Sequence, residues 1–125
     1  MPRPRVLVAD DVPANRTLFT VYLRDAYDVV AVETAEAALA EIEGGAVDAA
    51  LLDLSYGGGM TGLDLIRRLR EEPATAAVPT LALTAHASPA DRDRCLGAGF
   101  DAYLSKPVLR GQMLEAVREL LGGAA

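Results

Sequence analysis

The sequence predicts an α/β fold in which a doubly wound parallel sheet of five strands is covered by five helices. Short apolar runs alternate with longer amphipathic stretches about five times along the 125 residues. The apolar runs are nearly continuous, which is typical of strands that are covered on both faces. Polar residues follow directly after several of these runs. Such an alternation of strands and helices indicates a parallel sheet with helices on both sides.

The first half of the chain contains three predicted strands and two predicted helices. A helix is expected from about Pro13 to Arg24, with Leu18, Val21 and Tyr22 on one apolar face. Thr34 is expected to cap the second helix, which the pair Gly44-Gly45 ends. The strands are short runs of apolar or β-branched residues, expected over 6–9, 28–32 and 49–52.

A third helix follows a glycine-rich loop, Gly57-Gly58-Gly59, and ends at Pro73. We expect its apolar side to face the sheet and its arginines to lie on the solvated side. The inward residues are Leu63, Ile66 and Leu69, and the solvated ones are Arg67, Arg68 and Arg70.

The last part of the chain predicts two further strands and two helices. The strands are expected over 78–83 and 100–104. Between them, Ser88 caps a helix that has Pro89 at its first position. The final helix is expected over 109–121, with its inward residues at Met113, Val117, Leu120 and Leu121.

Length and composition exclude several classes of protein. A chain of 125 residues with 51% hydrophobic residues is expected to form one domain, residues 1–125, with a real core. The net charge of −6 argues against a nucleic-acid or membrane-surface binder. Cys95 is the only cysteine, so a disulfide scaffold is excluded. Signal-peptide and membrane-span patterns are missing, so we expect a soluble, cytoplasmic protein.

Polar residues at the predicted strand ends form a candidate site. These residues are Asp10 and Asp11 after the first strand, Asp53 after the third, Thr84 after the fourth and Lys106 after the fifth. In such sheets the carboxyl ends of the strands converge on one crevice. Three carboxylates that gather there repel one another unless a cation lies between them, and carboxylate oxygens suit Mg²⁺ or Mn²⁺. Lys106, the one lysine among twelve basic residues, and the Thr84 hydroxyl both suit a phosphoryl group.

The order of four short elements resembles the receiver domain of two-component response regulators, over essentially the whole chain. The elements are Val8-Ala9-Asp10-Asp11, Leu51-Leu52-Asp53-Leu54, Leu83-Thr84-Ala85-His86 and Tyr103-Leu104-Ser105-Lys106-Pro107. The last two together resemble receivers that work with hybrid histidine kinases. The resemblance implies a flavodoxin-like fold with strand order 2-1-3-4-5.

The resemblance also implies a role for each matching residue. Asp53 would accept the phosphoryl group, and Lys106 and Thr84 would contact it. Thr84 and Tyr103 would move on activation, and a cis peptide bond would precede Pro107. Mg²⁺ would be held by Asp10, Asp11, Asp53 and the backbone carbonyl of Ser55.

The same resemblance implies partners and a mode of action. The donor would be a histidine kinase or a histidine phosphotransfer protein. The downstream protein would bind the face formed by the fourth helix, fifth strand and fifth helix. The chain would be a phosphoacceptor switch that catalyses its own phosphotransfer and dephosphorylation, and it would not be classed as an enzyme.

One departure and two alternatives stay open. The loop from Ser55 to Gly62 lacks the usual proline and is one residue longer than the family pattern, which affects metal affinity and partner fit. A metal-dependent phosphatase that forms phosphoaspartate is an alternative, although Ser55 stands where such enzymes place a second aspartate. The second alternative is a degenerate receiver that serves only as a docking module. His86 is expected to be an exposed loop residue, and Cys95 a buried or half-buried helix residue.

Overall fold

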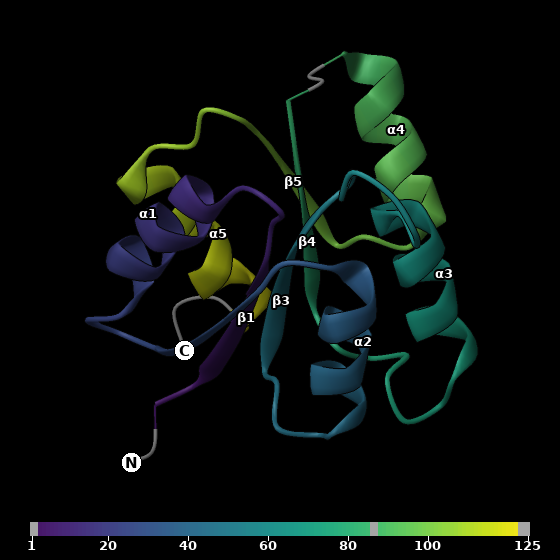
Figure 1. Ribbon diagram of the computed structural model, residues 1–125, viewed down its shortest axis with the longest axis horizontal. Helices are drawn as coiled ribbons and strands as arrows, with labels where there is room; N and C mark the ends of the chain where they lie inside the picture. The colour runs from purple at the N-terminus through teal and green to yellow at the C-terminus, as the bar shows by residue number, and fades with distance from the viewer. Residues whose placement is uncertain (1–2, 86–87, 123–125) are drawn as a thin grey trace.

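The computed structural model describes residues 3–85 and 88–122, and in them five strands alternate with five helices (Figure 1). The strands are β1 (Arg5–Ala9), β2 (Asp28–Val32), β3 (Ala49–Asp53), β4 (Thr80–Thr84) and β5 (Ala102–Ser105). The helices are α1 (Pro13–Leu23), α2 (Ala35–Glu43), α3 (Gly62–Glu71), α4 (Pro89–Ala98) and α5 (Arg110–Leu120).

All five strands pair in parallel in one sheet of order β2-β1-β3-β4-β5, which confirms the predicted flavodoxin-like topology. Helices α1 and α5 lie on one face of the sheet, and α2, α3 and α4 lie on the other (Figure 1). Each face buries its own apolar cluster: Phe19 and Met113 belong to the cluster under α1 and α5, and Leu65 and Cys95 to the other. Strands β3 and β4 are buried along their whole length.

Helices α2 and α4 begin at the capping residues that the sequence predicts. The Thr34 hydroxyl accepts a hydrogen bond from Ala37 N at 3.0 Å, and Ser88 Oγ accepts one from Asp91 N at 3.1 Å. Each helix has only 9 to 11 residues. Among the described residues, none of the helices has the length and apolar character that a membrane crossing requires.

Strands β4 and β5 both begin two residues later than predicted. Pro79 has no N–H to donate, so the ladder of β4 begins at Thr80. Before β5, Phe100 N donates to the Cys95 carbonyl at 3.2 Å and therefore closes the end of α4. The apolar runs from Val78 and from Phe100 thus include residues of turns that precede the strands.

The predicted apolar face of α1 is correct for Tyr22, which packs half-buried against the cluster under α1 and α5, and wrong for the other two residues. Leu18 and Val21 were expected to face the core, but they are 43% and 42% exposed. Phe19 and Leu23, which are four residues apart, are buried instead. Helix α1 contains apolar residues on two sides, so hydrophobic periodicity alone does not identify Phe19 and Leu23 as the most buried ones.

The expectation that Arg70 belongs to the solvated side of α3 is also wrong, although Arg67 and Arg68 are exposed as predicted. The Arg70 guanidinium donates to the carbonyls of Ala76, Val78 and Gly99 at 2.8–3.0 Å. Two further hydrogen bonds reach Thr80 Oγ1 at 2.9 Å and Asp101 Oδ2 at 3.0 Å. Arg70 therefore joins α3 to the segments that precede β4 and β5.

Candidate functional site

The predicted polar residues lie together at the carboxyl ends of four adjacent strands. Asp10 follows β1, Asp53 and Thr84 are the last residues of β3 and β4, and Lys106 follows β5. The connection leaves β1 toward β2 on one side, and β3 lies on the other side of β1. Strand order therefore reverses at β1 and β3, where ligands bind in doubly wound sheets.

Three carboxylates form the acidic part of the site. One oxygen from each of Asp10, Asp11 and Asp53 lies within 4.8 Å of the others. Asp10 is fully buried and Asp53 is 7% exposed. Asp11 is the most exposed member of the three. Carboxylates this close together repel one another unless a positive charge lies near them, and their hard oxygen donors match Mg²⁺ or Mn²⁺.

Lys106 supplies the positive charge that faces this cluster. Its Nζ donates to Asp10 Oδ2 at 2.8 Å and to Asp53 Oδ2 at 2.9 Å. Burial by itself lowers the pKa of Lys106, but its hydrogen bonds to the two carboxylates outweigh burial and raise it. The ammonium therefore stays charged at neutral pH.

For Asp53, burial outweighs the hydrogen bonds in setting the pKa, which is the reverse of Lys106. Desolvation by burial is the largest effect and raises the pKa of Asp53 above 3.8, against the lowering effect of the hydrogen bonds from Lys106 and from the Ser55 N–H. The Ser55 N–H lies 3.2 Å from Asp53 Oδ1. A poorly solvated carboxylate beside a cation is well suited to act as a nucleophile.

Asp10 is held in place by the start of α1. Val12 N donates to Asp10 Oδ1 at 2.9 Å, and Asn15 Nδ2 lies 3.3 Å from Asp10 Oδ2. The Arg16 guanidinium donates to the backbone carbonyl of Asp10 at 2.9 Å. Sequence reasoning missed Asn15 and Arg16, although both are among the first four residues of the helix that follows the acidic pair.

Thr84 and Tyr103 lie on the side of the site that the fourth and fifth strands form. Thr84 is 2% exposed, and its carbonyl accepts a hydrogen bond from Lys106 N at 2.7 Å. Tyr103 is half-buried and packs against the apolar cluster under α2, α3 and α4. Their predicted roles as moving parts stay predictions.

The glycine-rich loop passes beside the carboxylates. Gly57, Gly58 and Gly59 have positive φ angles of 76°, 154° and 68°, which residues other than glycine rarely adopt. A Cβ on Gly57 would lie 3.4 Å from Asp11 Oδ2. Glu36 of α2 fixes the far end of this loop, because its Oε2 accepts a hydrogen bond from Met60 N at 3.2 Å.

Tyr56 is a site residue that sequence reasoning missed. Its side chain is 8% exposed, and its hydroxyl donates to the Ala9 carbonyl at 3.4 Å. Burial, followed by the negative charges of Asp53, Asp10 and Asp11, raises the pKa of Tyr56, so the hydroxyl keeps its proton. A bulky aromatic residue before three glycines was the available signal.

Three smaller expectations have different outcomes. The peptide bond between Lys106 and Pro107 is cis, as predicted. Cys95 is buried, as predicted. His86 lies outside the described residues, so its expected exposure stays a prediction.

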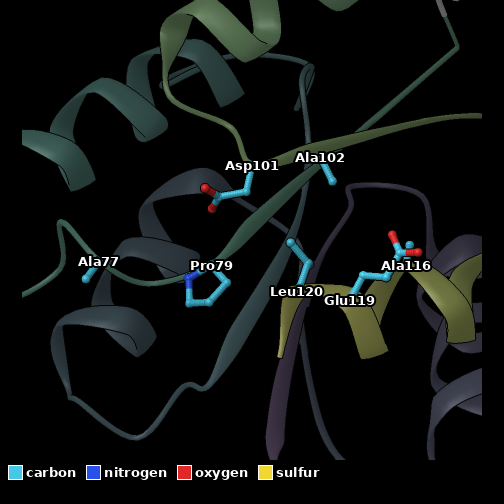
Figure 2. Close-up of a pocket in the computed structure, with 7 residues that line it drawn as sticks. All are labelled: Ala77, Pro79, Asp101, Ala102, Ala116, Glu119 and Leu120. Carbon is cyan, nitrogen blue, oxygen red and sulfur yellow. The ribbon is translucent and has the colours of Figure 1, made fainter. Parts of the chain in front are cut away.

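A separate cavity of about 280 Å³ lies away from this site (Figure 2). Pro79 and Asp101, which line it, stand just before β4 and β5, whereas the carboxylates stand at the carboxyl ends of β1 and β3. Because the strands are parallel, the cavity lies at their amino ends and the acidic site lies at their carboxyl ends. The cavity is therefore no part of the acidic site.

Comparison with known sequences identifies the family. The model of the response regulator receiver domain family matches residues 6–118. Sensor protein GacS of Pseudomonas syringae pv. syringae is 37% identical over 122 residues, which cover 95% of this chain and 14% of GacS. Sensory/regulatory protein RpfC of Xanthomonas campestris is 36% identical over 93% of this chain and 16% of RpfC. The chain thus spans about one seventh of the length of these sensor proteins.

Solved structures agree over almost the whole chain. A response regulator from Chloroflexus aurantiacus superposes with a TM-score of 0.89 at 30% identity and covers 97% of this chain and 98% of its own. The receiver domain of a sensor histidine kinase from Pseudomonas aeruginosa, which has a magnesium ion coordinated in its active-site cleft, gives 0.87 at 31% identity, with 97% and 99% covered. With the family model matched over residues 6–118, the chain belongs to the response regulator receiver domain family.

Proposed function

We propose that residues 1–125 act as one receiver domain that accepts a phosphoryl group on Asp53 with Mg²⁺ and changes conformation in response. The single observation that carries this proposal is the position of Lys106 Nζ, which contacts both Asp10 and Asp53 at 2.8 Å and 2.9 Å. A cation that is already placed against the candidate nucleophile suits the oxygens of an incoming phosphoryl group.

The donor set supports a magnesium site. Asp11 and Asp53 would bind the ion directly with the Ser55 carbonyl, and Asp10 would hold it mainly through water. The clustered carboxylate oxygens are the hard ligands that Mg²⁺ takes, and the ion keeps several waters in such sites. Bound Mg²⁺ would neutralise charge that develops on the phosphoryl oxygens.

The chain's own groups divide the transfer reaction between them. An Asp53 carboxylate oxygen attacks phosphorus in line, the P–N bond to the donor's phosphohistidine breaks, and the imidazole leaves and takes up a proton. Lys106 and the Thr84 hydroxyl contact the remaining phosphoryl oxygens. Water later attacks phosphorus, releases phosphate and regenerates the Asp53 carboxylate.

The phosphoryl group would act as a ligand that binds one of two conformations more tightly. Thr84 would move toward it, and Tyr103 would pack further inward. Tyr103 is only partly covered by its apolar cluster, which leaves it a half-buried side chain able to bury more surface. The downstream protein would read this change on the face of α4, β5 and α5.

The relatives GacS and RpfC support a kinase or a phosphotransfer protein as the donor.

The phosphatase alternative is not favoured, because Ser55 cannot act as a carboxylic general acid and the family match is to receivers. A docking module without phosphoryl chemistry is a further outcome of the test below.

The experiment is incubation with Mg²⁺ and acetyl phosphate, followed by intact-mass measurement. We expect one added phosphoryl group on the wild type, none without Mg²⁺, and none on Asp53→Asn. Lys106→Arg, which keeps the charge, should slow phosphorylation-linked switching because the planar guanidinium fits a compact site poorly. If the wild type gains no phosphoryl group but binds Mg²⁺, the docking module becomes the better account. Repeated turnover of a phosphate monoester would favour the phosphatase.

A further inference from the structure

A hydrogen bond links helix α1 to the loop that carries Lys106. The Tyr22 hydroxyl donates to the backbone carbonyl of Val108 at 3.1 Å, across 86 residues of sequence. The Tyr22 ring packs against the apolar cluster under α1 and α5, and its centroid lies 6.2 Å from that of Phe19. The ring is thus held from one side, and its hydroxyl reaches the loop between β5 and α5.

Hydrogen bonds hold the backbone at Lys106 and two residues after it. On the amino side, Lys106 N donates to the Thr84 carbonyl at 2.7 Å. On the carboxyl side, only Pro107 separates Lys106 from Val108, whose side chain is 3% exposed and whose carbonyl accepts the Tyr22 hydrogen bond. With both sides held, the Lys106 side chain starts from a defined point and ends between Asp10 and Asp53.

The same helix also holds Asp10 at its other end. Val12 N, directly before α1, and Asn15, in its first turn, hydrogen-bond the Asp10 carboxylate. In its last turn, α1 provides Tyr22. Helix α1 therefore sets the relative position of two groups, the Asp10 carboxylate and the Lys106 ammonium.

We propose that Tyr22 is a positioning residue for phosphoryl transfer, which acts on Lys106 through the Val108 carbonyl. This inference rests on the proposed function of Asp53 and Lys106. Removal of the Tyr22 hydroxyl leaves the Val108 carbonyl without this donor and loosens the loop. The Lys106 ammonium then spends less time at the place where the phosphoryl oxygens arrive.

The test compares Tyr22→Phe with Tyr27→Phe. Tyr27 is a matched control, because it packs half-buried against the same cluster. It stands just before β2, at the amino ends of the strands, whereas the site lies at their carboxyl ends. We expect Tyr22→Phe to slow phosphorylation by acetyl phosphate about three- to tenfold, which corresponds to the loss of one hydrogen bond. Mg²⁺ affinity should stay within about twofold, and Tyr27→Phe should match the wild type.

A spectroscopic readout separates positioning from a general loss of stability. Lys106 is the only lysine, so protein labelled with ¹³C-lysine gives a single side-chain signal set without further assignment. Its Cε resonance should shift in Tyr22→Phe and stay unchanged in Tyr27→Phe. All spectra and rates are recorded at a temperature at which the amide spectrum shows that each variant is folded.

A double-mutant cycle provides the second measurement. In a Lys106→Met background, adding Tyr22→Phe should change the phosphorylation rate by less than about twofold, because the group that Tyr22 positions is gone. An equal slowing in both backgrounds, or a Lys106 signal that Tyr22→Phe does not move, would overturn the inference. A wild type that takes up no phosphoryl group would instead refute the proposed function.

Discussion

Replacement of Lys106 by methionine tests the electrostatic arrangement of the site in the absence of metal. The Lys106 side chain is 18% exposed, and its ammonium contacts Asp10 at 2.8 Å and Asp53 at 2.9 Å. Removing one partner of a buried charge pair costs about 3–5 kcal/mol, and the solvent at this edge of the sheet reduces that cost. We therefore expect Lys106→Met to lower the free energy of unfolding by about 2–4 kcal/mol in EDTA.

For 125 residues the entropy of unfolding makes each kcal/mol worth about 4 °C, so Tm should fall by about 8–15 °C. Mg²⁺ should restore more stability to Lys106→Met than to the wild type, because no ammonium competes for the carboxylates. If the variant binds Mg²⁺ tenfold more tightly, a saturating concentration adds about 1.4 kcal/mol beyond the wild-type gain.

The assay is thermal unfolding in EDTA and in a series of Mg²⁺ concentrations. Arg3→Met is the control, because the ion pair of Arg3 with Asp28 has side chains that are 49% and 61% exposed. Such exposed pairs contribute less than about 1 kcal/mol. An equal Tm for Lys106→Met and the wild type in EDTA, or equal stabilisation by Mg²⁺, would refute the reasoning.

Three other predictions follow from single contacts. Arg70→Met should lower the free energy of unfolding by about 2–4 kcal/mol, because it leaves partly buried carbonyls unpaired. Exposed Arg67→Met should change the free energy of unfolding by less than about 0.5 kcal/mol in chemical denaturation. Gly62→Ala should reduce both stability and phosphorylation, since its Cβ would collide with the backbone of Asp53 and Leu54. Mg²⁺ affinity, measured by calorimetry, should fall as pH decreases through the raised pKa of Asp53, because protons then compete for the carboxylate.

Each of these has a contrary result. Equal denaturation midpoints for the two arginine variants would show that the Arg70 contacts contribute nothing. A Gly62→Ala protein with wild-type stability and phosphorylation would mean that the loop yields without moving Asp53. A Mg²⁺ affinity that stays constant until the pH approaches 3.8, the ordinary value for aspartate, would contradict the raised pKa of Asp53.

The sequence predicts the sheet and the site well because both depend on local signals. Near-continuous apolar runs mark the strands, and a polar residue at each strand end marks the site, so topology alone brings Asp10, Asp53 and Lys106 together. Caps such as Thr34 are also local, and they mark the helix starts correctly.

The remaining features depend on partners that are distant in the sequence. Arg70 reads as a surface residue because one of its acceptors, the Gly99 carbonyl, lies 29 residues away. The buried side of α1 is ambiguous because Leu18 is adjacent to Phe19, and only the neighbouring α5 selects between them. The contact of Tyr22 with the loop at Val108 spans 86 residues, so no local pattern indicates it.

The most direct measurement of the central claim locates the phosphoryl group on the chain. After reaction with acetyl phosphate and Mg²⁺, borohydride reduces an aspartyl phosphate to homoserine, which peptide mass mapping can place. The account predicts homoserine at residue 53 and at neither Asp10 nor Asp11. Reduction at another residue, or none in a wild type that remains folded and binds Mg²⁺, would contradict it.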